Sequence, residues 1–343
     1  MIHTETGRRI KQRDIAVQAG VSISTVSRVL NNMEGISDDL RRHVLAAAAE
    51  LGYQQGQTAA QPKLRHVHLF TAGSHLNPTL DPFHADLLAG IEAECRGLNI
   101  RLSYSALTEE TSDASFVIEK LGKDGEEGVL LLSVDDLELI AQLLAEGVPV
   151  VTINTDLQEL VVDSFLPDNQ SGPLKLMRYL IERGHRRILH VTQLQRRTLQ
   201  RRHESYRAGL EEAGIVYDPS LVIDTAVGTG GVYQTVRSLL QAGSLDFSAV
   251  FCVNDSSAVE VIHALKESGR RVPEDVSVVG YDDIPVAAFL TPPLTTVRIE
   301  RQQLCALAVR RLLDRLETPG LVPIRVELGA QLIERKSVTR LKR

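Results

Sequence analysis

Apolar residues recur at helical spacing near the start of the chain and predict two short helices around a tight turn. The residues that share the inner faces of these helices are Ile15, Ala16, Ala19, Val26, Val29 and Leu30. Gly20 separates the two helices, because glycine reaches positive φ without a Cβ clash. Ser22 caps the second helix, because its hydroxyl accepts a hydrogen bond from a free N–H of the first turn. The pattern is typical of a helix-turn-helix.

A third helix is predicted over about residues 38–51, and Gly52 ends it. Its first turn is acidic, which suits the positive end of a helix. The residues predicted on its inner face are Leu40, Val44, Leu45, Ala48 and Leu51. Residues 54–64 follow as a polar connector that contains Gly and Pro.

From His66 onward, short β-rich runs alternate with amphipathic helical stretches. Strands are predicted at 66–72, 100–105, 128–133, 149–153, 187–192, 221–224, 249–253 and 276–281. Helices are predicted near 84–97, 112–123, 135–146, 170–183, 203–213, 231–242, 256–268 and 300–317, and strand-like VPIRVEL and AQLIER follow the last one. Alternating β and α elements indicate parallel sheets with right-handed crossovers. Two such series predict two Rossmann-like lobes, with a ligand cleft beyond the strand ends.

The charged residues are distributed unevenly between the start of the chain and the remainder. The chain has 343 residues and a formal net charge of −6, so two or three domains are expected. Residues 1–64 contain eight basic and six acidic side chains, so a mildly basic head precedes an acidic body, as in a DNA-binding module attached to a larger domain. The three cysteines lie far apart and predict neither a disulfide framework nor a metal site. The chain has no run of about 18 apolar residues and no signal-peptide core, which favours a cytoplasmic protein.

Five ordered motifs make the whole chain resemble the lactose/galactose repressor (LacI/GalR) family of bacterial transcription regulators. They are DIAVQAGVSISTVSRVLN with ISDDLRRHVLAAAAELGY, DPFHADLLAGIEAE, LIERGHRRILHV, VFCVNDSSAVEVIHALKESGRRVPEDVSVVGYDD and PPLTTVRIE. The resemblance implies an all-α headpiece at 1–53, a hinge at 54–64, and an α/β effector-binding and dimerisation domain at 65–343, like a periplasmic binding protein. Its first lobe would comprise 66–165 plus 294–326, and its second lobe 166–293 plus 327–343.

The resemblance also implies DNA contacts for the second helix. Ile23, Ser24 and Arg28 would reach base edges in the major groove, and arginine bonds guanine bidentately. Thr25, Ser27 and Asn31 would contact phosphates. On a helix without such a family context, the same residues would simply be solvated.

The hinge departs from the family pattern. A leucine of the hinge helix enters the minor groove in the family, and Pro62 occupies that position here. Proline lacks an N–H and disfavours a helical residue before it, yet it still provides an apolar wedge. Leu64, with a shift of register, is the alternative wedge.

For the effector, the resemblance points to residues from several segments near the predicted cleft. They are Phe83, Asn154, Arg196, Thr198, Arg202, Asn254, Asp255 and Asp282. Asn and Asp at strand ends suit sugar hydroxyls, although such residues also cap turns. The spacing of Arg196, Thr198 and Arg202 resembles the purine-binding branch and suits an anionic or nucleobase effector. We expect Arg197 and Arg201 to lie in a solvated loop. The 224–230 loop lacks the aromatic residue of several sugar-binding relatives.

The leading interpretation is a DNA-binding repressor that a sugar or sugar derivative switches, acting as a homodimer or tetramer on a palindromic operator in the nucleoid. One alternative is the same regulator with an anionic or nucleobase effector that acts as a corepressor, and another is a solute-binding receptor. GTGG at 228–231 lacks a phosphate-loop lysine, and neither a catalytic constellation nor a cofactor site is recognisable, so we expect no enzyme. His66 and His68 form an H-x-H pair, but no third ligand lies nearby in sequence, so we favour a structural role over a metal site.

Overall fold

The chain forms two compact units, Met1–Pro62 and Lys63–Arg343. The computed structural model describes residues 11–30, 36–51, 64–77, 81–108, 111, 113–122, 125–225, 231–243, 246–318 and 320–341. Among them, no helix combines the length and the apolar character that crossing a bilayer requires.

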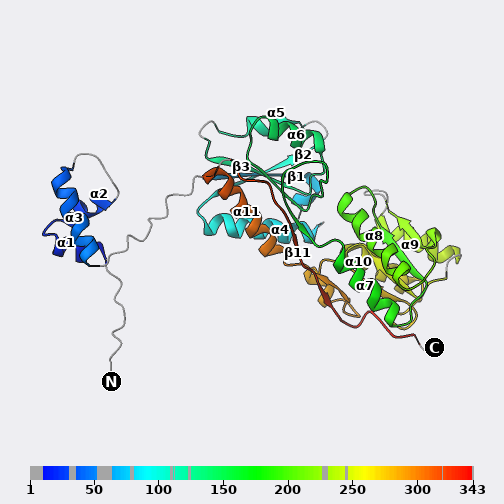
Figure 1. Ribbon diagram of the computed structural model, residues 1–343. Coiled ribbons are helices and arrows are strands. Elements are labelled where there is room, and N and C mark those ends of the chain that lie inside the picture. The colour runs from blue at the N-terminus through cyan, green and yellow to red at the C-terminus, as the bar shows by residue number, and fades with distance from the viewer. Residues whose placement is uncertain are drawn as a thin grey trace, which may run out of the picture. The chain divides into compact units, whose positions relative to one another are not determined.

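The first unit is a small helical domain (Figure 1). Its helices are α1 (Gln12–Gln18), α2 (Ile23–Leu30) and α3 (Asp38–Glu50). All six residues predicted to face inward on the first two helices are buried, and Gly20 has a φ of 59° at the turn. On α3, Val44 and Ala48 are buried as predicted, but the prediction for Leu45 was wrong, since it is 43% exposed. Val44, Ala47 and Ala48 already form the inner face, and the helical turn directs the neighbouring Leu45 outward.

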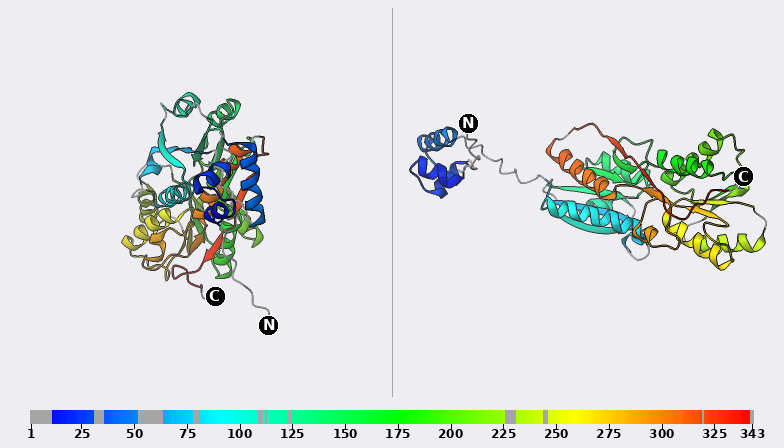
Figure 2. Two further views of the ribbon diagram at one scale, coloured as in Figure 1. Left: turned by 90° about the vertical axis from the view of Figure 1, so that its left-hand side faces the viewer. Right: turned by 90° about the horizontal axis from the view of Figure 1, so that it is seen from below.

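The first lobe of the second unit is built on a parallel six-stranded sheet in the order β11-β5-β4-β3-β1-β2. Its strands are β1 (His66–Ala72), β2 (Arg101–Leu107), β3 (Glu127–Leu132), β4 (Val150–Ile153), β5 (Asp163–Pro167) and β11 (Arg325–Leu328). Helices α4 (Pro82–Gly97) and α11 (Arg301–Glu317) pack on one face and α5 (Ala114–Glu119) and α6 (Leu137–Ala145) on the other (Figures 1 and 2). A short 3-10 turn, η1 (Gly73–Leu76), follows β1.

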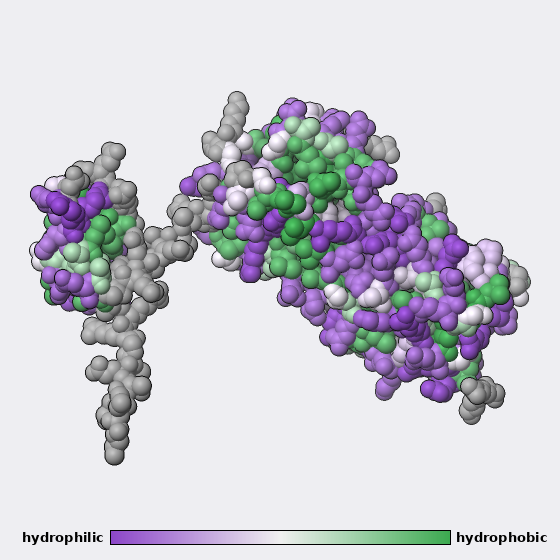
Figure 3. All heavy atoms as spheres, viewed as in Figure 1, coloured by the Kyte–Doolittle hydropathy of each residue, from purple (hydrophilic) through white to green (hydrophobic). Residues whose placement is uncertain are grey.

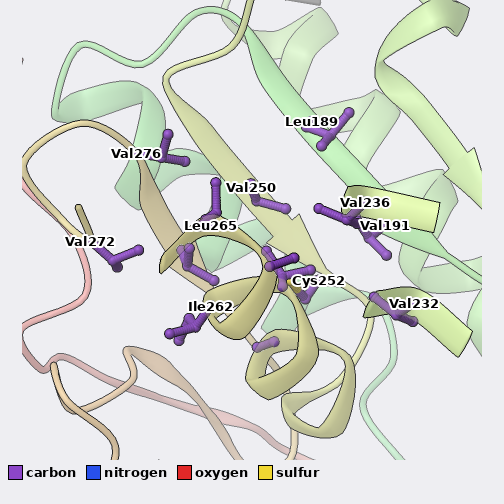
Figure 4. Close-up of a cluster of buried hydrophobic side chains, with 14 of the residues drawn as sticks. Leu189, Val191, Val232, Val236, Val250, Cys252, Ile262, Leu265, Val272 and Val276 are labelled. Carbon is purple, nitrogen blue, oxygen red and sulfur yellow. The ribbon is translucent and has the colours of Figure 1, made fainter. Parts of the chain in front are cut away.

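The second lobe contains a parallel four-stranded sheet in the order β7-β6-β8-β9. Its strands are β6 (Ile188–Thr192), β7 (Val222–Asp224), β8 (Ala249–Cys252) and β9 (Ser277–Val279). Helices α9 (Gly231–Ala242) and α10 (Asp255–Glu267) cover one face, where Val191, Cys252 and Leu265 meet in the apolar core of Figure 4. Helices α7 (Ser171–Glu182) and α8 (Arg197–Glu212) cover the other face. Two 3-10 turns, η2 (Pro219–Leu221) and η3 (Pro285–Ala288), complete it.

The chain crosses from the first lobe to the second after β5, returns to the first lobe before α11, and crosses to the second lobe again after β11. Near these passages, β10 (Thr296–Arg298) and β12 (Gln331–Ile333) form an antiparallel pair. Several elements differ from the prediction, among them β10, which was not predicted as a strand. The sequence pattern missed β5, whose Asp, Ser and Pro have low strand propensity, although all five residues are buried between β4 and β11. Helix α8 begins at Arg197 rather than near 203, so the arginine-rich segment lies on a helix and not in a loop.

Hydrophilic residues cover most of the visible face of the second lobe, whereas hydrophobic residues gather on that face of the first lobe (Figure 3). The exposed apolar side chains of the first lobe include Val161 and Val322. A cavity of about 400 Å³ is lined by Val161 and, among others, by Leu157, Arg201 and Ile324.

Candidate functional site

Helix α2 presents a polar and cationic outer face. The Ser22 Oγ accepts a hydrogen bond from the Thr25 N–H at 3.0 Å, which is the predicted N-cap contact. Ile23 is 51% exposed, Ser24 and Arg28 are exposed, and Thr25 and Ser27 are half-buried. A helix with this surface suits entry into a major groove, where Arg28 would face base edges. Asn31 and Pro62 lie outside the described residues. Leu64, the alternative wedge, is fully buried in the core of the first lobe and unavailable to DNA in this conformation.

The first lobe contributes a chain of hydrogen bonds at its strand ends. Asn154 follows β4 with a φ of 56°, and its Nδ2 donates to the Ser133 Oγ at 2.8 Å. The His84 ring lies between two oxygens, with Nε2 at 2.7 Å from the Ser133 Oγ and Nδ1 at 2.6 Å from the Asp81 carboxylate. His75 stacks on His84 at 3.7 Å between ring centroids. Burial and the charge of His84 lower the pKa of His75 to about 4.

The second lobe contributes a buried ion pair, Arg202 with Asp282. The Arg202 Nη1 lies 3.6 Å from the Asp282 Oδ1 and donates to the Val253 carbonyl at 2.7 Å. Its Nε donates to the Asn169 Oδ1 at 2.8 Å, and its guanidinium lies 3.8 Å from the centroid of the Tyr281 ring. Burial raises the pKa of Asp282 to about 6, although the Arg202 charge acts in the opposite direction.

The remaining arginines of the cluster also face carboxylates. Arg196 joins the lobes, because its Nε donates to Asp135 at 2.7 Å and its Nη2 donates to the Asn154 carbonyl at 2.7 Å. Arg197 pairs with Glu204 on its own helix at 2.7 Å. Arg201 was expected to be solvated, and this was wrong: its side chain is only 13% exposed. It lies 3.4 Å from Asp156 and 2.7 Å from Glu327 of the first lobe.

Within the described part of the chain, several buried polar atoms of these residues and of α8 have no hydrogen-bond partner. They include the Oδ1 atoms of Asn154 and Asp282 and the Oγ1 of Thr198. All three residues are at most 4% exposed. An unsatisfied buried polar group costs about 1–3 kcal/mol, so each of these atoms has hydrogen-bonding capacity that a polar ligand could use.

Three further predicted residues have partners of their own. Phe83 packs against the apolar clusters of both lobes. Asn254 is the N-cap of α10 and accepts from the Ser257 N–H at 2.8 Å. The fully buried Asp255 carboxylate accepts from the Thr296 hydroxyl at 2.5 Å and from the Ile284 N–H at 3.0 Å. Burial, together with the nearby charge of Asp282, raises its pKa well above the usual range. The structure thus brings Asn154 to Arg196 and Arg202 to Asp282, and gives Asn254 and Asp255 contacts that order their own lobe.

Sequence reasoning missed His84, Ser133 and Asp135 in this region. Ser133 ends a predicted strand, as Asn154 does, so the rule that ligands bind beyond strand ends was a signal for it. Asp135 lies 61 positions from its partner Arg196, and no local pattern indicates that pairing.

Comparisons with known proteins agree with this architecture. The family model for bacterial regulatory proteins of the lacI family matches residues 4–55, and the model for a periplasmic binding protein-like domain matches residues 177–338. The ribose operon repressor of Haemophilus influenzae is 32% identical over 331 residues, which cover 96% of this chain and 99% of the relative.

Two solved structures extend the likeness to the fold. The complex of the transcriptional regulator CelR with cellobiose is 32% identical with a TM-score of 0.71, and the match covers 96% of this chain and 100% of that chain. The lac repressor dimer bound to operator and the anti-inducer ONPF is 25% identical with a TM-score of 0.70, covering 97% of this chain and 100% of that chain. With its helix-turn-helix head and two-lobed body, the chain therefore belongs to the LacI family and is a DNA-binding transcriptional regulator, not an enzyme.

Proposed function

We propose that the effector of this regulator is a small neutral polyhydroxyl compound, such as a sugar, bound between the two lobes. Its binding changes the affinity of a homodimeric repressor for a palindromic operator. The observation that carries the proposal is the charge balance of the site: every arginine at 196, 197, 201 and 202 faces a carboxylate.

An anionic effector would have to displace one of these carboxylates. Arg196 already forms an ion pair with Asp135. Arg202 already forms an ion pair with Asp282 and donates hydrogen bonds to two further acceptors. Breaking the buried Arg202–Asp282 pair costs about 3–5 kcal/mol, which a carboxylate or phosphate ligand would first have to offset. A neutral ligand leaves these pairs intact.

The unpartnered atoms match the chemistry of hydroxyl groups. The oxygens of Asn154 and Asp282 accept hydrogen bonds, and the Thr198 hydroxyl both donates and accepts. A sugar hydroxyl donates one bond and accepts others, so one ligand satisfies atoms from both lobes. Phe83, which is only partly buried, supplies apolar surface for the carbon face of such a ligand. The ribose repressor and the cellobiose complex among the comparisons agree with this class.

The switch depends on contacts that join the lobes. Arg196 links α8 to Asp135, and Arg201 links the same helix to Asp156. An effector that binds the closed arrangement more tightly than the open one shifts the population of the two states. In a dimer this movement changes the spacing of the two headpieces, and therefore their fit to the two half-sites.

The DNA interface of the proposal is the outer face of α2. Ile23, Ser24 and Arg28 read bases, and Thr25 and Ser27 hold phosphates. Asn31 and Pro62 complete the proposed interface. The lac repressor dimer on its operator supports the homodimeric arrangement.

The test is a thermal-shift and calorimetric screen of the full chain. The panel holds neutral pentoses, hexoses and disaccharides, their phosphates, and nucleobases. A ligand present at about 100 times its Kd stabilises the folded state by about 2.7 kcal/mol, which a melting curve resolves. We expect a neutral sugar to bind, and Asn154→Ala to weaken that binding. Arg197→Ala, which breaks an ion pair within α8, is the matched control and should leave it unchanged.

The same ligand should change operator binding. Fluorescence anisotropy at fixed salt, with a labelled palindromic operator, measures the affinity with and without the sugar. Binding of sugar phosphates or nucleobases in preference to every neutral sugar would overturn the proposed effector class. A neutral sugar that binds without altering operator affinity would overturn the proposed switch.

A further inference from the structure

We propose that His66, His68 and Glu127 form a binding site for a divalent transition-metal ion of the zinc class. The site lies on the first lobe, at the start of β1 and β3, and is separate from the effector region at the opposite ends of these strands. It does not depend on the proposed effector.

Strand pairing brings the three side chains together. β1 and β3 are parallel, and His66 lies directly beside Glu127 in their register. His68 follows two residues later, so its side chain leaves the same face of the sheet. Among the described residues these three offer ligand atoms that all lie within 4.8 Å of one another. The H-x-H pair is visible in the sequence. Glu127 becomes the third ligand only because the pairing of β1 with β3 places it beside His66.

The distances between the ligand atoms are close to those of a metal site. The His68 Nε2 lies 2.9 Å from the Glu127 Oε2, and the His66 Nδ1 lies 3.6 Å from the Oε1. Tetrahedral zinc with bonds of about 2.0–2.2 Å places its ligand atoms roughly 3.4 Å apart. Small rotations of the side chains therefore suffice, and a water completes the four ligands. The His68 and Glu127 side chains are 7% and 21% exposed, so the site is sheltered but reachable.

Ser103 on β2 provides the outer support that metal-binding histidines use. Its Oγ lies 3.1 Å from the His66 Nε2 and 3.1 Å from the His68 Nδ1. A hydroxyl oxygen has two lone pairs and accepts both N–H groups at once. In that arrangement the other nitrogen of each ring directs a lone pair toward the Glu127 carboxylate. Three electron-rich groups that face one point form a ligand set for a cation.

The same contacts also describe the ion-free protein. His68 then donates from Nε2 to Glu127 and accepts the Ser103 hydroxyl proton on Nδ1, while His66 donates from Nε2 to Ser103. The His66 Nδ1 is left facing the carboxylate without a proton. Metal binding thus changes the tautomer of His68 and rotates the Ser103 hydroxyl, and the site accepts the ion without rebuilding the sheet.

The donor set selects the class of ion. Two imidazoles and one carboxylate suit Zn²⁺, Co²⁺ and Ni²⁺, whereas Mg²⁺ and Ca²⁺ prefer oxygen ligands alone. A second group with similar side chains, His75, Asp81 and His84, is a weaker candidate. Both ring nitrogens of His84 already bond to Asp81 and Ser133, and the His75 ring stacks on it. That group belongs to the effector region and serves as a control.

The experiment titrates the full chain with Zn²⁺ against a chromophoric chelator. We expect one tight site per chain, with no comparable binding of Mg²⁺. His66→Gln and Glu127→Gln each remove a ligand and should abolish tight binding. Ser103→Ala removes only the outer support and should weaken binding about 10- to 100-fold. Co²⁺ in place of Zn²⁺ should give the intense visible absorption of a tetrahedral site, which His66→Gln removes.

Two matched controls separate this site from other histidines. His75→Gln alters the second group, and His263→Gln removes an exposed histidine that pairs with Glu267 on α10. Both should bind Zn²⁺ like the unmodified chain, and circular dichroism checks that each variant folds. No tight binding by the unmodified chain, or equal affinity in His66→Gln, would overturn the proposal. A loss of tight binding in His75→Gln alone would move the site to the second group and overturn it as well.

Discussion

Replacing Arg202 by methionine is expected to destabilise the second unit strongly at neutral pH and much less in mild acid. The variant leaves the Asp282 carboxylate buried without its cation, 4% exposed in the second lobe. Removing one partner of a buried ion pair costs about 3–5 kcal/mol. Part of this loss comes from the hydrogen bonds to Asn169 and Val253, which together contribute roughly 2 kcal/mol. The rest is the penalty for an unpaired charge and should depend on pH.

The direction of the pH dependence follows from Asp282. Its pKa in the folded chain is about 6, against 3.8 for an unperturbed aspartate, so folding favours the neutral carboxyl. The contribution of the Asp282 carboxyl to the free energy of unfolding is therefore fully present below about pH 4. It is lost as the pH rises through about 6 and the carboxyl ionises in the folded chain. Arg202 holds this pKa down, so its removal raises the pKa further and extends the loss to higher pH. The difference between variant and unmodified chain should therefore widen from acid to neutral pH.

Urea unfolding of both chains at about pH 5 and about pH 8 measures this difference. We expect a gap of roughly 2 kcal/mol in acid and about 3–5 kcal/mol at the higher pH. Adding Asp282→Leu to Arg202→Met removes the unpaired charge and should recover most of the pH-dependent part. Arg196→Met is the control, because its pair with Asp135 is a quarter exposed and contributes about 1 kcal/mol or less. An equal gap at both pH values would refute the reasoning.

Three more outcomes follow from individual contacts. Gly209→Ala should cost about 1–2 kcal/mol, because its Cβ would lie 2.5 Å from a methionine of α7. Gly97→Ala meets no atom of the described residues within 4 Å and should stabilise by up to about 1 kcal/mol. Urea unfolding that ranks the two variants the other way contradicts the packing argument. Ser22→Ala should destabilise the headpiece by about 1 kcal/mol through loss of its N-cap bond, and faster amide exchange in α2 reports it, with Ser37→Ala as a comparison cap. Arg28→Ala should weaken operator binding by about 1–3 kcal/mol and relax the preference at one base pair, whereas an equal loss on every DNA sequence would assign it to phosphate.

The predicted elements show where local pattern is sufficient. The helices of the headpiece are recognisable because their apolar spacing, Gly20 and the Ser22 cap all lie within about one helical turn of the backbone they order. The alternation of strands and helices likewise indicated two parallel sheets. β5 escaped prediction because its stability comes from its neighbours. Its Asp163 carboxylate accepts from Arg311 and from the Ile324 N–H, and both partners lie about 150 residues further on.

The sequence by itself determined the family, the helix-turn-helix and the strand ends at which Asn154 and Asp282 stand, because period and capping are set within short segments and the order of the motifs is visible along the chain. Only the tertiary structure decided which charged and metal-binding side chains are neighbours. Arg196 pairs with Asp135, and Arg201 is buried beside Asp156. The register of β1 and β3 places Glu127 next to His66. Such pairings depend on how two distant strands or lobes are brought into contact. No local spacing encodes them, although they set the charge of the effector region and create the proposed metal site.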